Sequence, residues 1–75
     1  MKAKKDFFEL PNSSFLFDKQ YFHFDDFYHS VSLLTFCYYN DNGKLCYIYH
    51  VLIDSYFIRA FTSYNEASDY LSKLA

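Results

Sequence analysis

An Asn-Gly pair between two apolar runs constrains this chain more than any other feature. Residues 38–50 read YYNDNGKLCYIYH, in which Asn42-Gly43 is flanked on both sides by aromatic and β-branched residues. Asn-Gly is a strong hairpin signal because both residues tolerate the positive φ angles of a type I′ turn. The segment therefore predicts an antiparallel hairpin that is apolar on both faces. Such a sheet must be covered on both sides or completed by another molecule.

Three segments rich in Val, Ile, Tyr and Phe predict antiparallel strands around this turn. They cover residues 30–40, 44–53 and 56–61. A two-residue turn would place Cys37 opposite Ile48, whereas a four-residue loop would place it opposite Cys46. We expect two free, buried thiols, because an unpaired cysteine behaves as a small apolar residue.

The alternation of side chains along a strand assigns these residues to two faces, here in the register of a two-residue turn. The face that we expect a C-terminal helix to cover carries Leu34, Phe36, Tyr38, Leu45, Tyr47, Tyr49, Val51, Ile53, Tyr56, Ile58 and Ala60. The other face carries Val31, Leu33, Thr35, Cys37, Tyr39, Cys46, Ile48, His50, Leu52, Phe57, Arg59 and Phe61. Neither face is polar.

The C-terminal stretch TSYNEASDYLSKLA predicts that helix. Ser63 and Glu66 form a capping box, so the helix should begin at about Tyr64. Its apolar residues recur at the helical spacing i, i+3, i+4 and i+7 and form one stripe. They are Ala67, Tyr70, Leu71 and Leu74. The expected fold class is α+β: a small antiparallel sheet of three main strands plus an N-terminal hairpin or arm, with one C-terminal helix packed on one face.

The chain is expected to form a single domain of 75 residues. Its expected parts are a basic tail (1–5), an aromatic and acidic arm (6–29), an antiparallel meander (30–61) and the helix (63–75). Within the arm, short alternating stretches surround a turn candidate at Asp18-Lys19-Gln20 and predict a small hairpin or an extended segment. Alternatively, Asp25-Asp26 would cap a helix that runs through Val31.

Charge is distributed unevenly along the chain. Lys2, Lys4 and Lys5 are three of the seven basic residues, so four basic residues stand against nine acidic ones from position 6 onward. An acidic body repels phosphate and disfavours nucleic-acid binding, while it permits attraction to a basic partner. The longest apolar run, residues 45–53, is too short for a membrane span, and no secretory signal is visible. We expect a cytoplasmic location and no membrane association.

No constellation in the sequence predicts catalysis, a metal or a cofactor. His23, Asp25, Asp26 and His29 cluster in sequence, but neither a strand nor a helix would bring all four together. Cys37 and His50 would share a face in the two-residue register, but a reactive cysteine needs an electropositive, partly exposed setting. A chain with one glycine cannot build a glycine-rich phosphate loop. We therefore expect a protein that is not an enzyme.

Tyrosines and acidic residues suggest binding instead. Nine tyrosines are many to satisfy inside a small core, and tyrosine is enriched at protein interfaces. In FHFDDFYHS, aromatic rings alternate with carboxylates that could engage Arg or Lys of a partner. The residues expected to bind a protein partner with a basic surface are Asp18, Phe22, Phe24, Asp25, Asp26, Phe27 and Tyr28. A homodimer is a further possibility.

The C-terminal half, with DNGK at a turn and FTSYNEASDYL after the third strand, is similar in outline to the arm-binding domains of phage-type tyrosine recombinases. That resemblance implies a three-stranded sheet and a helix that bind DNA through basic residues on the sheet. This sheet departs from the pattern, since it offers only Lys44 and Arg59, and the departure disfavours DNA binding.

The function expected from the sequence is that of a small protein-binding inhibitor of the kind carried by phages and mobile elements, anti-CRISPR proteins among them by size and charge. Two alternatives stay open. One is a nucleic-acid-binding ββα module that uses aromatic stacking and the lysine tail. The other is a homodimeric structural protein whose sheets pack face to face.

Overall fold

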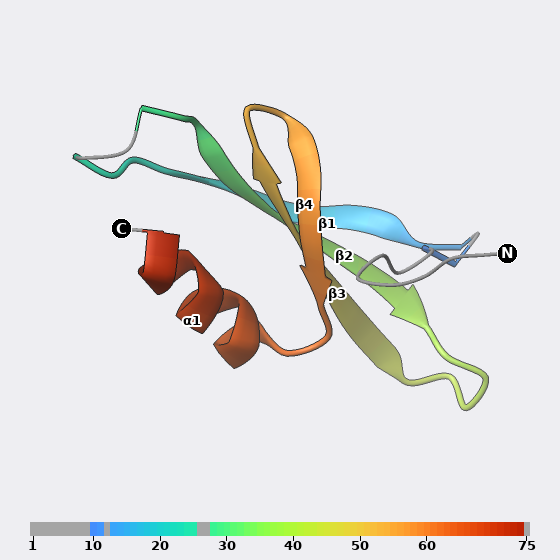
Figure 1. The fold of residues 1–75 in the computed structure, drawn as a ribbon. Helices are drawn as coiled ribbons and strands as arrows, with labels where there is room; N and C mark the ends of the chain where they lie inside the picture. Colours follow the sequence, from blue (N-terminus) through green and yellow to red (C-terminus); the bar gives the residue numbers. More distant parts are fainter. Residues whose placement is uncertain (1–9, 12, 26–27, 75) are drawn as a thin grey trace, which may run out of the picture.

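The computed structural model describes residues 10–11, 13–25 and 28–74. Within these residues, four strands and one helix follow one another: β1 (Phe15–Phe22), β2 (Val31–Tyr39), β3 (Leu45–Ile53), β4 (Tyr56–Phe61) and α1 (Tyr64–Leu74). The strands form one antiparallel sheet in the order β1-β2-β3-β4, and α1 packs against one face of it (Figure 1). The predicted α+β class with an antiparallel sheet and one C-terminal helix is confirmed.

The N-terminal arm contributes an edge strand to this sheet and not a hairpin of its own. β1 pairs with β2 from Phe15 opposite Cys37 to Phe22 opposite Val31, with a bulge between Leu16 and Asp18. The predicted turn at 18–20 therefore lies inside a strand. A helix running through Val31 is also wrong, since that residue begins β2. The free edge of β2 offers this segment a ladder of backbone hydrogen bonds, and pairing there overrides the local turn preference.

The β2–β3 hairpin has a loop of intermediate length. Gly43 adopts a φ of 77°, and its backbone N donates to the carbonyl of Asn40 at 2.9 Å. The backbone N of Asn40 in turn donates to the carbonyl of Lys44 at 2.9 Å. The Asn40 side-chain oxygen accepts from the backbone N atoms of Asn42 and Lys44, both at 2.9 Å. The loop therefore spans three residues and ends on a left-handed glycine, a common hairpin solution.

This loop sets a register one residue away from either predicted one, with Cys37 opposite Tyr47 and Cys46 opposite Tyr38. Because a one-residue slip moves a strand's side chains to the other face, the predicted grouping of the faces is wrong. The two cysteines lie on opposite faces, which precludes a bridge between them. Both are free thiols, Cys37 buried and Cys46 partly exposed.

We name the two faces by what distinguishes them. The helix face carries Val31, Leu33, Thr35, Cys37 and Tyr39 of β2 with Leu45, Tyr47, Tyr49, Val51 and Ile53 of β3. The His50 face carries Ser32, Leu34, Phe36 and Tyr38 of β2 with Cys46, Ile48, His50 and Leu52 of β3. A second bulge, between Val51 and Leu52, brings Arg59 and Phe61 of β4 to the helix face and Ala60 to the His50 face. The predicted placement of these three residues is therefore also reversed.

The core lies between α1 and the helix face. Buried Val31, Leu33 and Val51 of the sheet meet Ala67 and Leu71 of the helix. The apolar stripe of the helix that the spacing predicts is therefore the side of α1 that packs against the sheet. The helix begins at Tyr64 as predicted, and the Ser63 hydroxyl accepts from the backbone N of Glu66 at 3.4 Å. Among the described residues, this helix is too short and too polar to cross a membrane.

The β3–β4 turn consists of two residues with positive φ, Asp54 at 53° and Ser55 at 71°. This is the backbone pattern of a type I′ turn, whose twist matches that of the flanking strands. Neither residue is glycine, so both carry the steric cost of a Cβ in the left-handed region. The backbone N of Asp54 also donates to the carbonyl of Ser30 at 2.8 Å, which ties the turn to the start of β2.

Candidate functional site

A row of aromatic rings crosses the helix face beyond the core. Phe17 of β1 meets Tyr47 of β3 edge to face, with ring centroids 6.0 Å apart. Tyr47 stacks beside Tyr49 at 6.4 Å, and Tyr49 meets Tyr64 at 5.8 Å. Tyr64 is the first residue of α1. The rings therefore run without interruption from the edge strand to the start of the helix.

The bulge and the hairpin register together build this row. Phe17 and Tyr47 come from strands that β2 separates, so their rings meet above β2. Cys37 lies opposite both Phe15 and Tyr47 and is completely buried. Its small side chain leaves room for larger rings to close over it. Burial raises the pKa of the Cys37 thiol, as expected for a cysteine that serves as packing.

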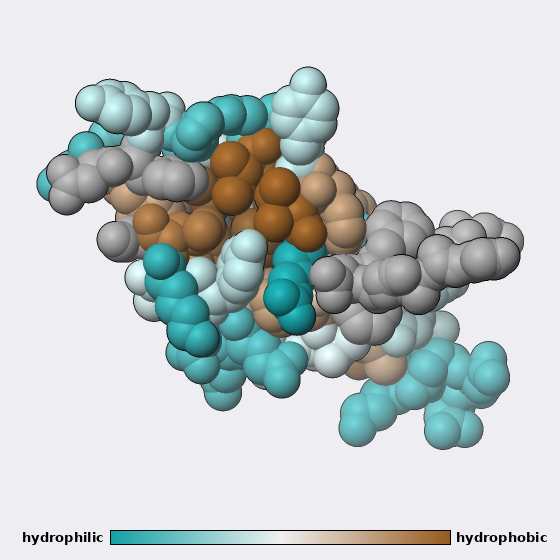
Figure 2. All heavy atoms as spheres, in the orientation of Figure 1, coloured by the Kyte–Doolittle hydropathy of each residue, from teal (hydrophilic) through white to brown (hydrophobic). Residues whose placement is uncertain are grey.

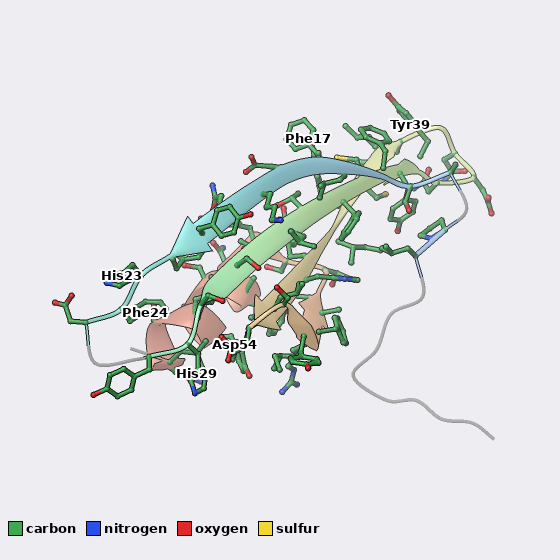
Figure 3. All side chains as sticks on the ribbon, turned by 90° about the horizontal axis from the view of Figure 1, so that it is seen from above. Phe17, His23, Phe24, His29, Tyr39 and Asp54 are labelled. Atoms are coloured by element: carbon green, nitrogen blue, oxygen red, sulfur yellow. The ribbon has the colours of Figure 1, made fainter. Side chains whose placement is uncertain are left out.

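Most of these rings are well exposed. We define the aromatic surface as the exposed aromatic residues of this end of the helix face and of the helix start. They are Phe15 (49%), Phe17 (62%), Tyr39 (62%), Tyr47 (39%) and Tyr64 (51%). Figure 3 shows Phe17 and Tyr39 toward the end of the sheet away from His23 and Phe24. A contiguous exposed patch of large apolar rings marks an interaction site more often than scattered single residues do.

A second group of apolar side chains gathers over β3 and β4 in the view of Figure 2. The exposed large apolar residues of β4 include Phe57 and Ile58, which are 36% and 38% exposed. Tyr56, at the start of the same strand, is 75% exposed. Phe57 and Ile58 are less exposed than every residue of the aromatic surface. Tyr56 is more exposed, but it takes no part in the row of ring contacts, and it therefore offers a matched control for a tyrosine of the aromatic surface.

The charges around the aromatic surface are mainly acidic. Asp18 lies on the helix face, opposite Thr35, and Asp41 follows Tyr39 by two residues in the β2–β3 loop. Two basic side chains are held elsewhere by rings: Lys19 lies over Tyr21 at 5.1 Å, and Arg59 over Phe61 at 5.7 Å. Lys44, directly after the β2–β3 loop, is exposed. Within the described residues, this arrangement does not provide the basic track that a phosphate backbone requires.

The edge of β1 is poorly suited to pairing with another strand. The bulge interrupts its ladder between Leu16 and Asp18, and the charged pair Asp18-Lys19 occupies the middle of the strand. Bulges and charges are the usual features that protect an edge strand from pairing with another chain. The side chains of the face are therefore better placed than the strand edge to contact a partner.

The structure does not gather the described members of the predicted partner-binding set into one patch. Phe22 and Phe24 stack on each other with centroids 6.4 Å apart and pack against the core. Asp25 and Tyr28 lie in the β1–β2 connection, where both are exposed and Tyr28 completely so. Asp18 lies in β1, as described above, while Asp26 and Phe27 lie outside the described residues.

None of the five residues of the aromatic surface, Phe15, Phe17, Tyr39, Tyr47 and Tyr64, is among the residues that the sequence predicts to bind a partner. The available signal was the cluster of tyrosines beside the Asn-Gly turn. In the two-residue register, however, Tyr39 and Tyr47 fall on opposite faces, and only the three-residue loop brings them to the same one. The aromatic surface therefore could not be recognised without the correct register.

The other constellations are separated in the fold. His29 contacts Asp54, at 2.6 Å, and lies in the β1–β2 connection. In the described part of the chain, no group of three or more His, Cys, Asp or Glu residues is close enough to hold a metal ion. Cys37 and His50 lie on opposite faces of the sheet, so they cannot act together as a nucleophile and its base.

Comparisons of this chain with models of protein families, with curated proteins and with solved structures found no match.

Proposed function

We propose that this chain is a small protein-binding module that docks on its partner through the aromatic surface. The observation that carries the proposal is the exposure of five large aromatic side chains at one end of the helix face, three of which belong to a continuous row of ring contacts. Phe and Tyr offer a large contact area at a low entropic cost, and they are enriched in the buried centres of protein interfaces. Each of the five aromatic residues is therefore a candidate hot spot for binding the partner.

The partner that this surface fits best is a protein with basic side chains. Asp18 shares the face of the rings, Asp41 follows Tyr39 by two residues, and the chain as a whole carries a net charge of −2. Arginine and lysine bind both to carboxylates and to the faces of aromatic rings. An acidic module of this kind would compete with nucleic acid for a basic surface, so the proposal includes an inhibitory role.

The charge distribution supports a protein partner over a nucleic-acid ligand. Lys19 and Arg59 are engaged with Tyr21 and Phe61 and do not line the aromatic surface. Aromatic stacking on single-stranded nucleic acid is normally combined with a basic groove that follows the phosphates. The described strands contribute no such groove beside these rings.

The experiment is a capture assay with matched variants. Immobilised wild-type protein, Tyr39→Ala and Tyr56→Ala would be exposed to a cell extract with and without nuclease treatment. We expect wild type and Tyr56→Ala to retain the same protein, Tyr39→Ala to lose it, and nuclease to have no effect. Far-UV circular dichroism would check that each variant is folded. Capture that nuclease abolishes, or that Tyr39→Ala leaves intact, would refute the proposal.

A further inference from the structure

His50 is a buried histidine with an unsatisfied ring nitrogen. It lies in β3, is 8% exposed, and its Nε2 atom is buried without a hydrogen-bond partner. Phe36 and Phe57 flank the imidazole edge to face, with centroids 5.0 Å and 4.9 Å away. A buried polar atom without a partner costs free energy, and a buried charge without a partner costs much more.

The row of residues across the sheet at this position adds no compensating charge. Lys19 of β1 lies opposite Leu34, Leu34 lies opposite His50, and His50 lies opposite Ala60. The one charged side chain in this row is therefore basic. Lys19 therefore cannot serve as the counter-charge of an imidazolium.

The remaining described titratable groups on the His50 face are phenols and a thiol. The titratable residues that share the face are Tyr21 of β1, Tyr38 of β2 and Cys46 of β3. Strand β4 contributes Phe57 and Ala60 beside His50, and α1 packs on the opposite face. Among the described strand residues, the one carboxylate is that of Asp18, which lies on the helix face. No described carboxylate on this face can therefore stabilise an imidazolium.

We propose that His50 makes the fold sensitive to acid. The native structure accommodates only the neutral imidazole, and protonation breaks the ring contacts of His50 with Phe36 and Phe57 and exposes the His50 face to solvent. Burial lowers the pKa of His50 below its ordinary value of 6.5. The unfolded chain consequently takes up this proton at a higher pH than the folded chain does. The stability contributed by neutral His50 is complete above about pH 6.5 and is lost as the pH falls through the folded pKa.

The test compares urea unfolding of wild type, His50→Phe and His23→Ala between pH 7.5 and pH 5. For wild type, we expect the unfolding equilibrium constant to rise over this range, by up to about tenfold for each pH unit below 6.5 until the folded pKa is reached. His50→Phe keeps an apolar ring between the two phenylalanines and should remove that rise. His23→Ala removes an exposed histidine outside the strands and should retain the rise. A wild type that is equally stable at both pH values, or a His50→Phe variant that keeps the wild-type slope, would overturn the proposal.

A second measurement keeps the proposal testable if His50→Phe does not fold. The ring signals of His50 in the wild-type protein can be followed by NMR as the pH is lowered. We expect them to remain those of a neutral imidazole below pH 6.5 for as long as the fold persists. A His50 that becomes protonated at its ordinary value while the fold is intact would contradict the assignment.

Discussion

The imidazole Nδ1 of His29 lies 2.6 Å from Oδ2 of Asp54, which joins the β1–β2 connection to the β3–β4 turn. The second carboxylate oxygen of Asp54 accepts from the backbone N of Ser30 at 3.1 Å and from the Ser30 hydroxyl at 3.4 Å. Figure 3 shows His29 and Asp54 side by side. One carboxylate thus holds two adjacent residues, His29 and Ser30, which lie 25 and 24 residues away in sequence.

This contact predicts acid sensitivity at low pH. The hydrogen bond with His29, and then that from the backbone of Ser30, lower the pKa of Asp54 below its ordinary value of 3.8. The corresponding stability is present above pH 3.8 and is lost as the pH falls through the lower folded pKa. Asp54→Asn should lower the midpoint of urea unfolding at pH 7 and remove this part of the acid response. Asn tolerates a positive φ, so the turn itself is preserved.

Asp69→Asn, on an exposed part of α1, is the matched control for Asp54→Asn. It should leave both the midpoint at pH 7 and the acid response close to those of wild type. Parallel loss of stability by wild type and Asp54→Asn between pH 5 and pH 2 would show that the carboxylate contributes nothing to the fold.

The left-handed backbone of Ser55 predicts a stabilising substitution. Ser55 has a φ of 71°, where a Cβ is sterically disfavoured by roughly 1–2 kcal/mol. Ser55→Gly removes that cost but adds backbone entropy to the unfolded chain, so we expect a net gain of about 0.5–1 kcal/mol in unfolding free energy. Ser68→Gly, inside α1, should instead lower it by about 0.5 kcal/mol. Loss of stability in Ser55→Gly would show that this residue does not adopt the left-handed conformation.

The register of the hairpin can be tested through its cysteines. Because Cys37 and Cys46 lie on opposite faces, a mild oxidant should form no disulfide within the native chain. A thiol reagent should modify partly exposed Cys46 quickly and buried Cys37 only after unfolding, and Cys46→Ser should remove the fast phase. An internal disulfide, seen as a mass loss of about two hydrogens, would place the cysteines on one face.

Local features of the sequence predicted the helix well. Ser63 caps α1, and Ala67 and Leu71 form its buried stripe, because capping and helical spacing depend on neighbours within one or two turns. The existence of the β2–β3 hairpin also followed from its Asn-Gly pair. These features need no knowledge of the rest of the chain.

The sheet register could not be predicted in the same way. It depends on the Asn40 side chain, which accepts from two backbone N atoms and selects a three-residue loop. The bulges beside Leu16 and Val51 shift two further pairings by one residue. Since each slip reverses a face, the sequence alone does not assign Tyr39 and Tyr47 to a common surface, and it points to residues 18–28 as the partner-binding segment.

The most direct test of the aromatic surface is site-specific crosslinking. A photoreactive phenylalanine analogue would replace Tyr39 in one sample and Tyr56 in another, since both are exposed tyrosines on the same sheet. After irradiation in cell extract, the crosslinked molecules would be identified by mass spectrometry, with unlabelled wild type and a Phe17→Ala/Tyr47→Ala variant as competitors. We predict one protein crosslinked from position 39 and not from position 56, displaced by wild type but not by the double variant. Equal crosslinking from both positions, or crosslinking only to nucleic acid or to a second copy of the chain, would contradict the account.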